Sequence, residues 1–219
     1  MPLPAIPHYD MPAALAASAV HWSPQRDRAA LLVHDMQNYF LRPFEGDRVL
    51  GALLANVHAL RQACAEHGIP VIYSRQAGSQ SAGERGLTAE FWGPGMSDSP
   101  ADTAIPEAIA PRPGDHEVIK RRYSAFHDST LRQLLTDLDR DQLIICGVYA
   151  HIGIQQTAAD AMQHDLPPFV VADAVADFDR DRHETALRYV GDLFGRVLRA
   201  HNVITAFSQQ RQARSGAAG

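Results

Sequence analysis

The chain has 219 residues, 46% of them hydrophobic, and carries a formal net charge of -5. That length and apolar content suffice for one compact domain with a substantial core, and the acidic balance argues against nucleic-acid binding. No apolar run approaches the roughly 20 residues needed to cross a bilayer, so we expect neither a membrane segment nor a membrane partner.

Buried strands and amphipathic helices alternate along the chain. The run "AALLVHD" at Ala29–Asp35 is apolar until its polar end, which is typical of a strand buried on both faces. Apolar residues then recur at helical spacing from Asp47 to His67, and Gly68 is expected to end that helix. Further strands are expected at Ile69–Ser74, Glu117–Lys120, Gln142–Val148, Phe169–Asp173 and Asn202–Thr205.

Helices are expected between these strands. Asp128 or Ser129 can cap a helix over "LRQLLTDL", and two more are expected at about Ile154–His164 and Arg182–Phe194. Strands separated by helices of this length predict right-handed βαβ units, and hence an α/β fold with a parallel sheet covered on both faces. The segment from 76 to about 114 is long, rich in Gly and Pro, and typical of a functional loop.

Both ends of the chain are predicted to be peripheral. We expect one domain over residues 1–207, beginning with an N-terminal arm at 1–27, and a disordered tail at 208–219. Cys64 and Cys146 lie in apolar periodic segments, where reduced core residues are expected rather than functional ones. Reduced cysteines suit a cytoplasmic protein.

Polar residues follow four successive strands. Asp35 ends the first strand, Gln76 follows the second, Lys120 ends the third, and the turn Tyr149–Gly153 follows the fourth. Ligands of open parallel sheets bind beyond the carboxyl ends of the strands, so these groups are expected to converge on one rim. Each has an ordinary explanation alone, because an Asp after a strand often forms a turn and a Lys is usually a solvated charge. Their joint position makes this rim the candidate site.

Five motifs carry a resemblance to a known family: "LLVHDMQNYFL", "FWGPGM", "KRRYSAF", "GVYAHIG" and "PFVVADAVADF". In this order they resemble the isochorismatase family, both the isochorismatases of siderophore pathways and the 2-amino-2-deoxyisochorismate hydrolases of phenazine pathways. The resemblance implies a three-layer sandwich around a doubly wound six-stranded parallel sheet of order 3-2-1-4-5-6, and a homodimer. It also implies a cis peptide near Val148–Tyr149 that presents backbone N–H groups to a carboxylate.

The wider superfamily includes cysteine amidases, whose nucleophile stands where this chain has Gly153. Some of them also hold a metal ion with an Asp–His–His site after the second strand. Here that loop reads "RQAGSQSAGERG" without histidine, and the scattered histidines show no ligand spacing, so no metal or other cofactor is expected. An amidase activity is therefore the less favoured alternative.

The chemistry implied by the resemblance fits a turn without a nucleophile. A vinyl ether is cleaved by protonating its terminal methylene carbon; water captures the oxocarbenium ion, and the hemiketal collapses to pyruvate and an alcohol. Asp35 is the expected acid, and it needs apolar surroundings that raise its pKa, whereas a tight pair with Lys120 would lower that pKa. Gly153 would leave room for the substrate and expose a backbone N–H.

The other predicted site residues are expected to surround this acid. Lys120 would orient it and hold a substrate carboxylate, and Gln76 would hydrogen-bond the ether oxygen or the attacking water. Arg85 suits bidentate carboxylate binding, although a solvated loop arginine explains it equally well. The walls are expected to come from Phe40, Trp92, Tyr123 and Tyr149.

Two arginines depart from the family pattern. Arg121 replaces a tryptophan of "KWRYSAF", and Arg75 stands where a small residue is usual; each either adds positive charge near a dianionic substrate or faces solvent. These positions leave open whether the substrate is isochorismate or 2-amino-2-deoxyisochorismate. A non-catalytic scaffold of an assembly line is the alternative from another class. The chain ends soon after the last predicted strand without room for a carrier domain, which favours a stand-alone enzyme acting on a small molecule.

Overall fold

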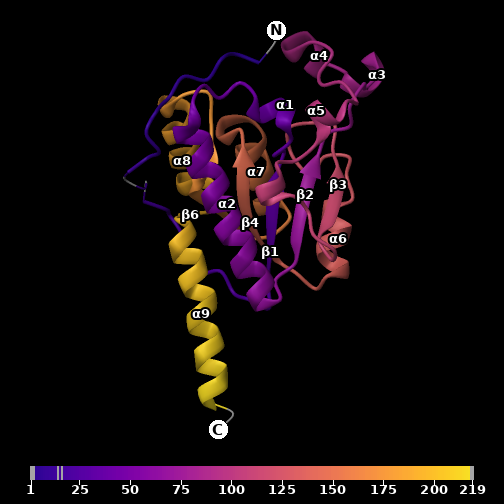
Figure 1. The fold of residues 1–219 in the computed structure, drawn as a ribbon. Coiled ribbons are helices and arrows are strands. Elements are labelled where there is room, and N and C mark those ends of the chain that lie inside the picture. The colour runs from indigo at the N-terminus through magenta and orange to yellow at the C-terminus, as the bar shows by residue number, and fades with distance from the viewer. Residues whose placement is uncertain (1–2, 14, 16, 218–219) are drawn as a thin grey trace.

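Six parallel strands form one sheet through the middle of the molecule (Figure 1). The computed structural model describes residues 3–13, 15 and 17–217. The strands are β1 (Ala29–His34), β2 (Val71–Arg75), β3 (His116–Ile119), β4 (Gln142–Val148), β5 (Pro168–Ala176) and β6 (Arg196–Leu198). They lie in the order β3-β2-β1-β4-β5-β6, and every neighbouring pair is parallel. The predicted fold class and strand order are confirmed.

Helices cover both faces of the sheet. The helices of the described residues are α1 (Asn38–Leu41), α2 (Asp47–His67), α3 (Ala82–Arg85), α4 (Thr88–Trp92), α5 (Pro100–Thr103), η1 (Glu107–Ile109), α6 (Leu131–Asp137), η2 (Ala150–Ile154), α7 (Gln155–Gln163), α8 (Arg180–Leu193) and α9 (Ala200–Ala217). Buried residues of α2 and α9 pack on one face, and those of α6, α7 and α8 pack on the other, which gives three layers. No helix in the described part of the chain has the length and apolar character needed to cross a membrane.

The central strands are enclosed on both faces, which explains their unbroken apolar sequences. Every residue of β1 and of β4 is buried. Leu31 and Val33 belong to the core cluster of α2 and α9, while Leu32 belongs to the cluster of α6, α7 and α8. A shift of one residue would exchange the two faces, so this packing fixes the register of the strands and the positions of their carboxyl ends.

Local sequence predicted one helix boundary and missed another. Helix α2 ends at His67 as predicted, and Gly68 follows with a φ of 66°. A residue without a Cβ adopts this left-handed conformation at little cost. At the start of α6 the N-cap is Thr130, with no side-chain capping bond among the described residues, so the predicted caps Asp128 and Ser129 were wrong; the Ser129 hydroxyl accepts a hydrogen bond from the Leu131 N–H at 3.2 Å, one residue beyond the N-cap.

The carboxyl-terminal part of the chain differs from the prediction. The sixth strand is β6, which pairs with β5, whereas the predicted strand Asn202–Thr205 lies inside α9. The prediction was wrong because a strand of three residues carries little pattern, and because Val203 and Phe207 are buried at helical spacing. The tail expected at 208–219 is helical up to Ala217, and residues 218 and 219 lie outside the described residues.

Hydrogen bonds attach the N-terminal arm to the rest of the domain. Ile6 forms an isolated bridge with Phe44, and its N–H donates to the Pro43 carbonyl at 2.8 Å. The Tyr9 hydroxyl accepts a hydrogen bond from the Asp177 N–H at 2.9 Å. These contacts bring the beginning of the arm to the carboxyl end of the sheet.

Candidate active site

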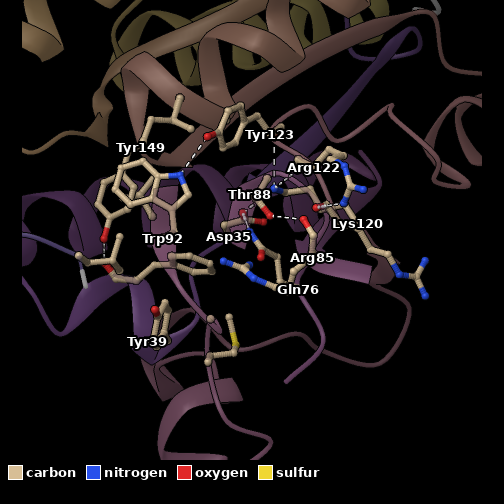
Figure 2. A pocket seen from close by; sticks show the side chains of 18 residues that line it. Asp35, Tyr39, Gln76, Arg85, Thr88, Trp92, Lys120, Arg122, Tyr123 and Tyr149 are labelled. Atoms are coloured by element: carbon tan, nitrogen blue, oxygen red, sulfur yellow. Dashed lines mark hydrogen bonds and ion pairs between the residues drawn. The ribbon is translucent and has the colours of Figure 1, made fainter. Parts of the chain in front are cut away.

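The carboxyl ends of four neighbouring strands meet at one rim. Asp35 follows β1, Gln76 follows β2, Lys120 follows β3 and Tyr149 follows β4. The order β3-β2-β1-β4 places these residues next to one another, and Figure 2 shows their side chains around one pocket. The pocket has about 620 Å³ of empty space, its open mouth included.

All the predicted site residues line this pocket. They are Asp35, Gln76, Lys120, Phe40, Arg85, Trp92, Tyr123, Tyr149 and Gly153. The strand-end rule therefore located the pocket, and the long loop between β2 and β3 supplies part of its wall through α3 and α4. What each residue does in the reaction stays a prediction.

Asp35 is surrounded by hydrogen-bond donors. The Lys120 Nζ lies 2.6 Å from its Oδ2, and the Ser74 hydroxyl donates to its Oδ1 at 2.8 Å. The Gln76 Nε2 donates to Oδ2 at 3.3 Å. Its backbone has a φ of 51°, and its own N–H is directed at Ser74. Donors on both oxygens favour the ionised carboxylate.

The pKa of Asp35 differs from the expectation. Burial by itself raises the pKa of this carboxyl, but the charge of Lys120 and the hydrogen bonds from Lys120 and Ser74 outweigh burial and lower it. The prediction of a raised pKa was wrong, because the apolar surroundings also contain a cation at 2.6 Å. Asp35 is therefore ionised at neutral pH in the free enzyme.

The ammonium group of Lys120 has three acceptors within the protein. Its side chain is 1% exposed, and Nζ donates to the carbonyls of Arg122 at 2.9 Å and Tyr123 at 3.3 Å besides contacting Asp35. Three acceptors use all three hydrogens of an ammonium group. A bond to a substrate carboxylate would have to replace one of these contacts, and the expected carboxylate-binding role of Lys120 stays a prediction.

Gln76 is held by its main chain. Its N–H donates to Gln37 Oε1 at 2.8 Å, and Gln37 Nε2 donates to its carbonyl at 3.0 Å. This clamp directs the amide group of Gln76 toward Asp35. The Gln76 Oε1 has no hydrogen-bond partner among the described residues, so it can accept a bond from a ligand hydroxyl or a water.

Two guanidinium groups in the pocket have no carboxylate partner among residues 3–13, 15 and 17–217. Arg85 donates from Nε and Nη2 to the Gly93 carbonyl at 3.2 and 3.0 Å. Arg122 donates from Nη1 to the carbonyls of Glu84 and Arg121 at 2.8 and 3.0 Å. Carbonyl contacts fix these groups without neutralising their charge, so the pocket is suited to an anionic ligand.

Aromatic side chains form the opposite wall (Figure 2). The Trp92 Nε1 donates to the Tyr123 hydroxyl at 2.9 Å. The Tyr149 hydroxyl donates to the Phe40 carbonyl at 2.5 Å. These bonds hold the rings in place, so the wall is largely apolar toward the pocket.

The turn after β4 supplies no nucleophile. The peptide bond between Val148 and Tyr149 is cis, as the resemblance implied, and Gly153 lines the pocket. Both cysteines are buried outside it, and burial raises the pKa of Cys64 to about 12 and that of Cys146 further. In the described part of the chain no three His, Cys, Asp or Glu side chains are grouped so that they could hold a metal ion.

The model of the isochorismatase domain matches residues 29–202. The chain belongs to the isochorismatase family. It is 44% identical over 204 residues to phenazine biosynthesis protein PhzD of Pseudomonas fluorescens, covering 92% of this chain and 98% of that protein. It is 43% identical over 210 residues to enterobactin synthase component B of Escherichia coli K12, covering 94% and 73% of the two chains.

Solved structures share the isochorismatase fold. A cysteine hydrolase of Pseudomonas syringae superposes with a TM-score of 0.80 at 24% identity, covering 91% of this chain and 99% of that one. N-carbamoylsarcosine amidase of Thermoplasma acidophilum superposes with a TM-score of 0.67 at 26% identity, covering 79% and 96%. The same architecture is thus present in proteins named for different hydrolytic reactions. The reaction of this isochorismatase family hydrolase must therefore be inferred from its pocket.

The two arginines that depart from the isochorismatase pattern lie in different places. Arg121 lines the pocket, with its Nη2 3.4 Å from a carboxylate oxygen of Glu84. Arg75 does not line the pocket; it pairs with Glu117 at 3.0 Å and donates to the Thr103 carbonyl at 3.0 Å. Of the two, Arg121 therefore places its guanidinium group at the pocket and Arg75 does not.

Sequence reasoning missed several polar side chains of this isochorismatase site, Thr88 among them. Ser74 bonds Asp35 because its strand pairs with β1 in a register that sets Ser74 opposite His34. Tyr39 and Arg122 line the pocket from the segments after β1 and β3. The signal for Ser74 is its strand-end position, but the register is needed to use it. Nothing in the sequence alone indicates which way Tyr39 and Arg122 face.

Proposed function

We propose that this isochorismatase family hydrolase cleaves the enolpyruvyl ether of isochorismate or 2-amino-2-deoxyisochorismate. The products would be pyruvate and a trans-dihydro-hydroxybenzoate or dihydro-hydroxyanthranilate. The observation that carries the proposal is a pocket that, among the described residues, combines a buried carboxyl group, Asp35, with two guanidinium groups that have no carboxylate partner and with no thiol. A dicarboxylate ether complements that charge, and its cleavage requires a proton donor rather than a nucleophile. The names of the relatives support the same assignment.

Asp35 would protonate the terminal methylene carbon of the enolpyruvyl group. The vinyl π electrons form the new C–H bond, which leaves an oxocarbenium ion and an Asp35 carboxylate. Water adds to the cationic carbon and returns one proton to Asp35. The hemiketal then breaks its bond to the ring oxygen, which takes the remaining hydroxyl proton, and pyruvate leaves. This series of steps needs no covalent bond between substrate and protein.

The ionised resting state of Asp35 requires that a proton enters with the substrate. Lys120 stabilises the carboxylate at 2.6 Å. A bound dianion would bring negative charge into the same buried pocket and raise the pKa of Asp35. Asp35 would therefore take up a proton as the substrate binds and act as an acid only in the complex.

The remaining polar groups would orient the substrate. Arg85 and Arg122 would bind its carboxylates, because neither has a carboxylate partner in the described part of the chain and carbonyl contacts fix their positions. The Gln76 Oε1 would hold the attacking water, and the backbone N–H of Gly153 would face a carboxylate. We also propose that the enzyme is a homodimer in the cytoplasm, uses no cofactor, and serves siderophore, phenazine or related secondary-metabolite biosynthesis.

Pyruvate release tests the proposed function. The purified protein is incubated separately with isochorismate and with 2-amino-2-deoxyisochorismate, and lactate dehydrogenase reports the pyruvate. We expect NADH consumption with at least one of them, and the ratio of the two kcat/KM values identifies the preferred substrate. Absence of pyruvate with both would contradict the proposal and favour the non-catalytic scaffold.

A further inference from the structure

His34 lies beside the pocket, one residue before Asp35, and has no role in the mechanism above. Its side chain is fully buried at the end of β1. The His34 Nδ1 lies 3.0 Å from the Val148 carbonyl, so Nδ1 carries the hydrogen and donates it. Burial lowers the pKa of His34 to about 4, and the ring is neutral at neutral pH.

The ring of His34 fills the space next to Gly153. A Cβ added to Gly153 would lie 2.2 Å from Cε1 of His34, 2.9 Å from Nε2 and 3.1 Å from Nδ1. Separations this short are far inside van der Waals contact, so one of the two groups would have to move. Gly153 lines the pocket, whereas the His34 ring lies behind it.

The ring cannot move away easily. The main chain of His34 is paired with Ser74 of β2 on one side and Gly147 of β4 on the other. A Cβ at Gly147 would lie 2.1 Å from the His34 carbonyl oxygen, so the two strands approach closely here. The bond from Nδ1 to Val148 fixes the plane of the ring. A side chain at position 153 would therefore collide with the ring.

We propose that His34 is a specificity-determining positioning residue, whose ring reserves position 153 for glycine and so keeps a nucleophile out of the pocket beside Asp35. The functional part of this inference rests on the proposed ether hydrolysis. A cysteine at 153 would supply the nucleophile of an amidase. With His34 in place, no side chain can occupy that position without displacing the ring. The choice between acid chemistry and nucleophilic chemistry is thus made partly by a residue that does not touch the substrate.

A double-mutant cycle tests the spatial claim without using any substrate. Thermal unfolding is measured for the wild type, His34→Ala, Gly153→Ala and the double variant. Overpacking predicts that Gly153→Ala lowers Tm by about 5–10 °C in the wild type but by no more than about 2 °C in the His34→Ala background. Gly51→Ala, in α2 where an added Cβ meets nothing within 4 Å, is the control and should not lower Tm in either background.

Equal losses of Tm in the two backgrounds would overturn the inference. His34→Val gives a second cycle if His34→Ala unfolds, because the valine side chain is shorter than the imidazole. Failure of both His34 variants to fold would also overturn it, since His34 would then support the fold rather than reserve position 153. Both variants lose the bond from Nδ1 to the Val148 carbonyl, so circular dichroism first establishes that each of them is folded.

Kinetics and thiol labelling separate this role from a merely structural one. Gly153→Ala should reduce kcat/KM at least about tenfold in the wild type, and less than about threefold when added to His34→Ala. Gly153→Cys combined with His34→Ala should present one thiol to Ellman's reagent in the folded protein, because both native cysteines are buried. A thiol that stays unlabelled in that variant, or equal kinetic losses in both backgrounds, would contradict the inference. If the wild type released no pyruvate, the proposed function would fail, and the Tm cycle would still decide the spatial claim.

Discussion

The Lys120 Nζ lies 2.6 Å from the Asp35 Oδ2 in an almost fully buried ion pair. Removing one partner of such a pair leaves the other charge without compensation, which costs about 3–5 kcal/mol. The same contact controls the proton that the proposed reaction needs. The free energy of unfolding should therefore fall as the pH falls into the acid range, whereas kcat/KM should fall as the pH rises through the neutral range.

The free energy of unfolding should fall in acid because of Asp35. Its pKa in the folded protein is lowered from 3.8, so its contribution to stability is complete above that value and is lost as the pH falls through the folded pKa. Asp35→Asn should be about 3–5 kcal/mol less stable than the wild type near neutral pH and should lose less between about pH 5 and pH 2. Urea denaturation across that range measures both effects.

Asp10→Asn is the control for this titration. The Asp10 side chain is 78% exposed, and its ion pair with Arg48 is equally exposed, so its loss should leave the pH dependence unchanged. Parallel stability curves for the wild type and Asp35→Asn would show that the buried pair is not the source of the acid sensitivity.

The value of kcat/KM should fall as the pH rises through the neutral range. The pH dependence of kcat/KM reflects the ionisation of the free enzyme, in which Asp35 has lost the proton that the reaction requires. The expected slope is about -1 in log kcat/KM per pH unit, while kcat, which reports the complex, should stay level to higher pH. Initial rates of pyruvate release in buffers of constant ionic strength measure both profiles. A rise of kcat/KM with pH, as expected for a thiolate enzyme, would be inconsistent with Asp35 as the acid.

Lys120→Gln should move that profile toward higher pH. Loss of the ammonium group removes the charge that lowers the pKa of Asp35, so the descending limb should shift upward by about one to two pH units. We expect KM to change little, because the three hydrogens of Nζ are used within the protein. An unmoved limb with a raised KM would show instead that Lys120 binds the substrate carboxylate.

Arg122→Gln should weaken substrate binding. Its guanidinium group lines the pocket without a carboxylate partner among the described residues, so its loss should raise KM by about 10–100-fold. Arg75→Gln is the matched control, because Arg75 is paired with Glu117 outside the pocket. Steady-state kinetics of the two variants side by side make the comparison, and equal effects on KM would rule out a specific role for Arg122.

Thiol reagents and chelators should leave the activity intact. Cys64 and Cys146 are buried, and burial raises the pKa of both thiols. Iodoacetamide and EDTA, each incubated with the enzyme before the pyruvate assay, should change the rate by less than about twofold. Rapid inactivation by iodoacetamide that substrate prevents would indicate a nucleophilic thiol in the site.

The sheet and the rim were predictable from sequence for different reasons. β1 and β4 are enclosed by helices on both faces, and this burial explains why their sequences are apolar throughout. The rim followed from topology, since residues after parallel strands must lie at one edge. β6 was missed because it has three residues, and α9 was missed because the branched residues of Asn202–Thr205 have the composition of a strand.

The electrostatic state of the site was not predictable in the same way. An apolar strand before Asp35 indicates burial, which raises a carboxyl pKa, and this is the largest single effect on Asp35. The opposing effect depends on a 2.6 Å contact with Lys120, which lies far from Asp35 in the sequence. Sequence places the two residues on one rim, but only the folded chain sets the distance between their charges.

Turnover by Asp35→Asn tests most directly whether Asp35 is the proton donor. The variant keeps the size of the side chain but cannot donate a carboxylic proton, and circular dichroism first verifies that it is folded. Pyruvate release is then measured with the substrate that the wild type prefers, and product binding by calorimetry. We expect kcat to fall by about 10⁴-fold or more while the product binds within about threefold of wild type. If Asp35→Asn kept more than about a tenth of the wild-type kcat, Asp35 would not be the acid that cleaves the ether.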